Sequence, residues 1–132
     1  MKNRFLINLF LILFSPLGVS AQEVNVDSLK ILLQTEKHDT TRANVLLLIA
    51  ESSGEDGNWM DYNSQALVLS EKNIPTAKGN SLKAFLRVKA GAYNNIGYDQ
   101  TTKGNLASAL NYYTKSLQIV QEIKSDSDIA FI

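Results

Sequence analysis

The side chains that carry most enzyme chemistry are scarce in this chain of 132 residues, which has one histidine and no cysteine. His38 stands beside Asp39, but no Gly-x-Ser-x-Gly turn singles out a nucleophilic serine for a hydrolytic triad. One histidine cannot form a histidine-rich metal site or a two-histidine relay. We therefore expect no catalysis, no cofactor and no metal, and we interpret His38 as a solvated residue between helices.

Three short segments resemble ligand-binding loops and depart from them in detail. Residues 97–103 superficially resemble a phosphate loop, but Thr102 replaces its second glycine, Gly104, the next residue, replaces its metal-binding hydroxyl, and no strand is expected before it. Residues 56–58 and 126–128 offer oxygens to calcium, but they lack the glycine and the glutamate that complete a calcium loop. We interpret the three segments as a hairpin turn, a turn and a helix cap.

Acidic residues gather around one expected turn, and they are Glu51, Glu55, Asp56 and Asp61. Such a cluster either meets a basic partner or forms a solvated face, and we favour the solvated face. The aromatic side chains recur at helical spacing and are expected in the core. Trp59 is among the expected core residues, whereas Tyr112 falls off its stripe and is expected to be exposed.

Residues 1–21 have the three parts of a secretory signal. Lys2 and Arg4 give a positive start, residues 5–14 an apolar run, and small side chains lead up to Ala21. Cleavage before Gln22 predicts an exported protein, periplasmic or extracellular. The apolar run is about half the ~20 residues of a spanning helix, so an uncleaved signal anchor is the alternative and the only membrane contact that we expect.

Cleavage removes two basic residues and no acidic one, so the mature chain is slightly acidic. That balance argues against nucleic acid or an anionic membrane as the main partner. Residues 22–132 are long enough for one domain with a modest core.

After Gln22 the sequence predicts an all-α chain of about five helices, because no stretch alternates polar and apolar residues as a half-buried strand does. Asn25 or Asp27 is expected to cap the first helix, and Asp39 or Thr40 the second. Residues 45–50 are apolar on every side, so the second helix must be covered from more than one direction. The helices are expected at about 28–37, 40–51, 59–72, 81–100 and 106–124.

The fifth helix is expected to bury Leu106, Ala109, Leu110, Tyr113, Leu117 and Val120. Residues 125–128 then read as a new helix cap, followed by an apolar stub at 129–132. A stub without cover indicates either a truncated product or a segment that docks outside the chain.

Residues 90–124 resemble a tetratricopeptide repeat (TPR), in which two helices form a hairpin. Gly97 and Ala109 are small where the helices of such a hairpin cross closely, and Tyr93 and Tyr113 fill the space beside them. Gln100 departs from the family pattern, which usually has tyrosine there. The matching residues are Tyr93, Ile96, Gly97, Gly104, Ala109, Tyr113 and Leu117.

An imperfect earlier copy pairs residues 49–50 with 96–97 and residues 65–69 with 115–119, at unequal offsets longer than the ~34 of a standard repeat. The resemblance therefore implies an α-solenoid. Its parts are hairpins at about 40–72 and 82–124, and a truncated third repeat from about 126.

The order of parts is similar to the extracytoplasmic N-terminal TPR region of bacterial sensor histidine kinases. A signal is followed by Val-Asp-Ser-Leu-Lys at 26–30, Asp-Thr-Thr-Arg at 39–42 and Tyr-Asn-Asn-Ile-Gly at 93–97. In that family the repeats precede a transmembrane helix and an output domain. Neither is in this sequence, so kinase activity is not implied.

In TPR arrays the first helix of each hairpin lines a concave groove that binds peptides. By resemblance Asn94, Tyr98 and Thr101 face this groove, with Asn95 close to it. Two asparagines in mid-helix cost perhaps ~1 kcal/mol relative to alanine, which indicates a role beyond solubility. The alternative is that they bond across to the neighbouring hairpin.

The expected function is an extracytoplasmic protein–protein interaction module, the sensor or scaffold part of a signalling protein, with a protein or peptide as partner. Self-association through the C-terminal edge is a further option. A truncated, nonfunctional fragment of a TPR sensor histidine kinase is the alternative. A small hydrolase built on Glu51, Asp61 and a serine is a remote third.

Overall fold

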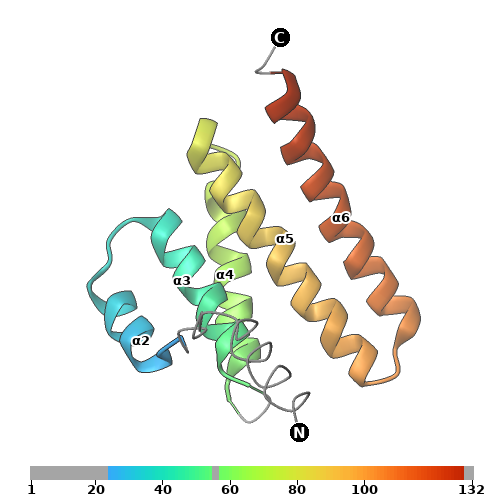
Figure 1. Ribbon diagram of the computed structural model, residues 1–132, viewed down its shortest axis with the longest axis horizontal. Coiled ribbons are helices and arrows are strands. Elements are labelled where there is room, and N and C mark those ends of the chain that lie inside the picture. Colours follow the sequence, from blue (N-terminus) through green and yellow to red (C-terminus); the bar gives the residue numbers. More distant parts are fainter. Residues whose placement is uncertain (1–23, 55–56, 130–132) are drawn as a thin grey trace, which may run out of the picture.

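The computed structural model describes residues 24–54 and 57–129, with side chains as far as Ser125. Over these residues the chain is all-α, as predicted, and none of its helices is long and apolar enough to cross a membrane. The expected signal at 1–21 and residues 130–132 of the expected stub lie outside the described part. The helices are α2 (Val26–Thr35), α3 (Asp39–Ser52), α4 (Trp59–Asn73), α5 (Gly79–Thr102) and α6 (Leu106–Ile129) (Figure 1).

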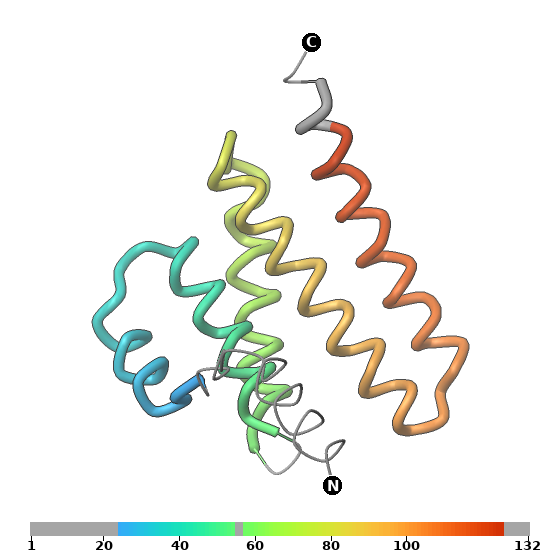
Figure 2. The backbone as a smooth tube through the Cα atoms, in the orientation of Figure 1, coloured from blue at the N-terminus to red at the C-terminus, as the bar shows by residue number. Residues whose placement is uncertain are grey.

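The helices lie side by side in chain order, from α2 at one edge to α6 at the other (Figure 1). α3 packs against α4 and α5 against α6, and α5 also packs against both α3 and α4. Among the described helices, the backbone of α2 packs closely against α3 alone, and that of α6 against α5 alone. Figure 2 shows the chain reversing between α5 and α6 through one tight turn. α5 is therefore the element that joins the outer helix to the rest.

The centre of the core is α3, whose neighbours are α2, α4 and α5. Ala43 and Ile49 are fully buried, and residues 45–47 and Ala50 are buried with them. This arrangement confirms that an all-round apolar helix needs cover from more than one direction. Side chains from the two following helices complete this cluster, chiefly Ala66, Phe85, Val88 and Ala92.

The α5–α6 hairpin crosses as closely as the sequence predicts. A Cβ atom added to Gly97 would lie 2.7 Å from the Tyr113 ring, and Ala109 is buried. Gly104 turns the chain with φ +78°, a conformation that suits glycine. A second close approach was not predicted: a Cβ atom on Gly91 would lie 2.7 Å from Cδ2 of Leu47, where α5 meets α3.

The expected buried stripe of α6 is wrong for most of its members. Leu106 and Leu110 are each 67% exposed, Leu117 is 56% exposed and Val120 is 39% exposed. Of the expected stripe only Ala109 is buried. The face that meets α5 is rotated by about one residue, roughly 100°, and it carries Ala109, Tyr112, Ser116, Ile119 and Ile123.

Two small side chains on the packed face of α6, Ala109 and Ser116, let the two backbones approach. Ser116 donates a hydrogen bond from Oγ to the Ala90 carbonyl oxygen at 2.8 Å, a contact that a leucine cannot make. Tyr112, expected to be exposed, is half-buried, and its ring lies 5.8 Å from that of Tyr93.

The helix break expected at 125–128 is also wrong. α6 runs without interruption from Leu106 to Ile129, so no new helix begins at 126. Serine and aspartate favour helix caps but are tolerated in an exposed helix, and one cap signal does not stop a helix that is already formed. The third repeat expected from about 126 thus has no start in the described backbone.

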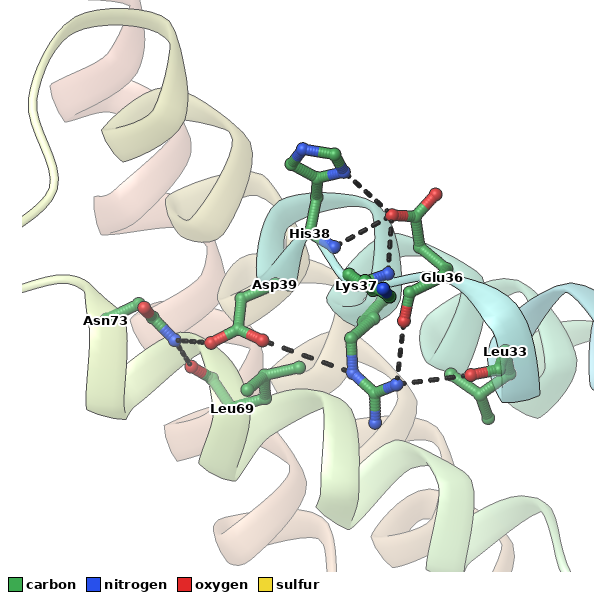
Figure 3. A network of polar contacts seen from close by, with 8 residues as sticks. Leu33, Glu36, Lys37, His38, Asp39, Leu69 and Asn73 are labelled. Atoms are coloured by element: carbon green, nitrogen blue, oxygen red, sulfur yellow. Dashed lines mark hydrogen bonds and ion pairs between the residues drawn. The ribbon is translucent and has the colours of Figure 1, made fainter.

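Side chains from α3 and α4 hold the segment between α2 and α3. Arg42 donates from Nη1 to the carbonyl oxygens of Leu33 and Glu36, both at 3.1 Å, which satisfies the end of α2. Asn73, at the end of α4, donates from Nδ2 to Asp39 Oδ2 at 3.1 Å (Figure 3). The Asp-Thr-Thr-Arg segment is thus a joint between α2, α3 and α4.

A carboxylate shapes the same joint from the α2 side. Oε1 of Glu36 accepts hydrogen bonds from the backbone N–H groups of Lys37 and His38 at 2.8 and 2.7 Å, and it lies 2.9 Å from His38 Nδ1 (Figure 3). These bonds, first of all the one from the His38 backbone, hold the pKa of Glu36 below its ordinary value. The His38 ring is exposed, as expected.

The caps agree with the sequence at one helix and differ at the other. Asn25 Oδ1 accepts from the Ser28 N–H at 3.1 Å, so one of the two expected residues caps α2. The expected cap of α3 by Asp39 or Thr40 is wrong, because His38 occupies the N-cap position without a side-chain bond.

Candidate functional site

A cavity of about 510 Å³ lies where the end of α3, the start of α4 and the second half of α5 meet. Its volume is within the ~300–1,000 Å³ that small-ligand pockets usually have. We call it the junction pocket. Its lining residues are Ala50, Glu51, Gly54, Trp59, Asn95, Tyr98, Asp99 and Thr102.

One face of α5 supplies half of this lining. Asn95, Tyr98, Asp99 and Thr102 follow the i, i+3, i+4, i+7 spacing of a single helical face. Asn95 and Tyr98 belong to the four residues that the resemblance implies for peptide binding. The other two, Asn94 and Thr101, do not line the pocket, so the face is turned by about one residue from the expected one.

Asn95 has a structural role as well as a place in the pocket. Its Nδ2 donates to Asn63 Oδ1 of α4 at 3.0 Å, and Asn63 Nδ2 donates to the Ala92 carbonyl oxygen of α5 at 3.2 Å. Asn63 is fully buried, so this chain of bonds satisfies a polar group inside the α4–α5 contact. Asn95 thus forms the hydrogen bond to the neighbouring hairpin that the sequence offers as the alternative to peptide binding.

The two remaining residues of the expected set differ from each other. Asn94 is exposed and makes no hydrogen bond with a residue that the structure describes. Thr101 donates from Oγ1 to the Gly97 carbonyl oxygen at 2.9 Å and lies 3.4 Å from Tyr113 Oη, on the side toward α6. Thr102, which does line the pocket, donates to the Asp99 carbonyl oxygen at 2.8 Å. Both threonine hydroxyls therefore bond to their own helix.

Two carboxylates make the pocket acidic. Asp99 accepts from Lys103 Nζ at 2.7 Å and from Gln100 Nε2 at 3.2 Å, and its side chain is only 13% exposed. Glu51 is exposed and forms no hydrogen bond or ion pair with the described residues. One negative charge is thus compensated within the fold, and the other faces the pocket without a counter-charge from the described residues.

Four residues that line the pocket are not predicted as binding residues from the sequence, and they are Glu51, Trp59, Asp99 and Thr102. The sequence predicts a solvated acidic face for Glu51 and a core position for Trp59, whereas Trp59 is half-buried at the pocket edge. Helical periodicity alone predicts that Asp99 and Thr102 share a face with Asn95, because they follow it by four and seven residues. No signal in the sequence joins α5 to the start of α4.

A second cavity, of about 280 Å³, separates α2 from the α3–α4 turn. Lys30 Nζ, one of its lining groups, lies 6.0 Å from the Tyr62 ring centroid, a cation–π contact at the limit of its range. Nowhere in the described ranges do three histidine, aspartate or glutamate side chains gather as metal ligands.

Comparison with protein-family models, curated proteins and solved structures finds no match to this chain. The all-α fold therefore stands on the structure itself. The TPR resemblance stays a prediction, based on the motif between Tyr93 and Leu117.

Proposed function

We propose that this chain is an exported protein–protein interaction module of the TPR type, which binds a peptide segment of its partner in the junction pocket. The observation that carries the proposal is the position of Asn95 and Tyr98. Both were implied as peptide-binding residues, and both line a cavity large enough for a side chain and the backbone beside it.

The helix contacts support the same proposal. α3 with α4 and α5 with α6 form two successive pairs, and α5 touches both helices of the first pair. Stacked helix pairs of a repeat array have such contacts between neighbours. The pocket lies at this α3–α4–α5 contact, where an array presents residues from more than one repeat. We propose no catalytic role.

A displayed library of random peptides, panned against the purified protein, tests this function. We expect peptides whose binding is lost in the Tyr98→Ala variant, because Tyr98 is 54% exposed and lines the pocket. Gln118→Ala is the matched control, since Gln118 is exposed on α6 and does not line the pocket. Peptides that bind both variants equally, or the absence of any selected peptide, would contradict the proposal.

The exposed stripe of α6 favours self-association as a second activity. Leu106, Leu110, Leu117 and Val120 face solvent on one side of a helix whose only described neighbour is α5. Contiguous apolar patches of this kind mark contact surfaces more often than free ones. We propose that two copies meet through this edge at high concentration.

A further inference from the structure

The junction pocket carries carboxylates at positions that disfavour them within a helix. Glu51 lies in the last turn of α3 and Asp99 in the last turn of α5, where unpaired backbone carbonyls already carry partial negative charge. Neither last turn of these two described helices contains a basic residue. Lys103, directly after α5, compensates Asp99, whereas Glu51 has no described partner. Residues that oppose a local structural preference and add no stabilising contact to the fold are typical of functional sites.

We propose that the junction pocket binds a lysine or arginine side chain, so that the partner segment it recognises is cationic. The proposal deepens the proposed function and rests on it. Glu51 supplies the charge that pairs with the incoming cation, and the C-terminal ends of α3 and α5 add to it. The N-terminal end of α4 carries a partial positive charge of about half an elementary charge, which opposes a bound cation. The C-terminal ends of α3 and α5 together carry roughly one negative elementary charge, which outweighs it.

Two aromatic rings complete a site for such a side chain. Trp59, at the first residue of α4, and Tyr98 of α5 line the same cavity as Glu51. A cation over an aromatic face is attracted by the ring quadrupole, most strongly over tryptophan. The same rings can cover the apolar stem that both lysine and arginine carry. An acidic segment would meet Glu51 with like charge, and a purely apolar one would leave the carboxylate desolvated and unpaired.

The first test is the composition of the peptides that the protein selects from the random library. We expect the peptides lost in Tyr98→Ala to be enriched in lysine or arginine. Panning against Glu51→Gln should abolish that enrichment, while Glu122→Gln, an equal charge change at an exposed site on α6, should retain it. Tyr98-dependent peptides without basic residues would overturn the cationic site and leave the proposed function standing. Failure to select any Tyr98-dependent peptide would overturn both.

The second test uses citrulline, a neutral analogue of arginine. Trp59 is the only tryptophan of the chain, so its fluorescence reports on the pocket directly. Replacing the arginine of a selected peptide by citrulline, which keeps the shape and removes the charge, should weaken binding about tenfold in wild type. In Glu51→Gln the two peptides should bind within about twofold of each other. An unchanged tenfold preference in that variant would remove Glu51 from the site.

A stability measurement separates this role from a structural one. Because Glu51 opposes the end of α3 and pairs with no described residue, Glu51→Gln should leave the thermal midpoint unchanged or raise it while weakening the cationic peptide. A lower midpoint together with weaker binding would show that Glu51 supports the fold, and would overturn the proposal.

Discussion

Single residues in this protein serve packing and recognition at once. Asn95 of α5 donates a hydrogen bond to Asn63 of α4, which donates in turn to the Ala92 carbonyl oxygen of α5, and Asn95 also lines the junction pocket. The sequence showed that two mid-helix asparagines need a reason, but it could not assign one. The reason depends on Asn63, which belongs to another helix and has no motif of its own.

Gly97 provides a prediction at this scale. Gly97→Ala should lower the free energy of unfolding by about 1–2 kcal/mol, because the added Cβ would lie 2.7 Å from the Tyr113 ring and overpacking outweighs the ~1 kcal/mol of helix propensity gained. Urea unfolding measures the difference.

Gly91→Ala is the matched control for that substitution. Its Cβ would meet the terminal Cδ2 atom of Leu47 at the same 2.7 Å, but that atom ends a flexible side chain and can rotate away. We expect a smaller loss than at Gly97. If Gly97→Ala stabilised the protein as at an ordinary helical position, the close crossing of α5 and α6 would be refuted.

At the scale of the elements, the sequence predicted helices well and their faces poorly. Polar breaks with glycine or proline placed the starts of α4 and α6 at the expected residues, Trp59 and Leu106. The apolar period then indicated the wrong side of α6, because it favoured Leu110 and Leu117, which are exposed, over Ser116, which packs against α5. Periodicity indicates which side of a helix is apolar, whereas helix packing also depends on which side has side chains small enough for a neighbouring helix to approach.

The joint between α2 and α3 gives a prediction about pH. Hydrogen bonds from the His38 backbone and ring lower the pKa of Glu36 in the folded protein. A lowered folded pKa means that the stabilisation is fully present above the ordinary carboxylate pKa and is lost as the pH falls through the folded one. The protection of the α2 amides against exchange, relative to the intrinsic exchange rate at each pH, should therefore fall over that acidic range, because α2 has no buried residue and its backbone packs against α3 alone.

Glu36→Gln is the variant that checks the cause. Its α2 amides should have low protection factors already at neutral pH and lose no further protection from this joint on acidification, as measured by hydrogen exchange with mass spectrometry. Asp27→Asn, in the first turn of the same helix, removes a carboxylate without touching the joint. If Asp27→Asn abolished the acid response and Glu36→Gln retained it, the Glu36 assignment would fail.

At the scale of the whole molecule, the two ends are held less firmly than the middle. α2 and α6 each dock on one described helix, whereas α3, α4 and α5 all contact one another. The all-α class was predictable from the sequence because every segment has a helical pattern. The open face of α6 was not, because its exposure depends on which neighbours are present rather than on its own residues.

Self-association through α6 is the prediction at this scale. Sedimentation velocity should show the average mass rising with protein concentration, and Leu110→Gln combined with Leu117→Gln should weaken association at least tenfold, since each buried leucine contributes about 1.5–3 kcal/mol. Asn111→Ala combined with Gln118→Ala changes two exposed α6 residues outside the stripe and should have no effect. A wild-type protein that sediments as a monomer at every concentration would contradict the prediction.

The position of α5 has a mechanical consequence. Gly97 and Thr101 of this helix face Tyr113 on α6, while Tyr98 and Thr102, one residue further along, line the junction pocket. α6 has no other described neighbour, so a force on α6 reaches the rest of the described chain through α5. A twist of one helix moves both of its sides together. The shape of the junction pocket is thus coupled, through α5, to the position of α6.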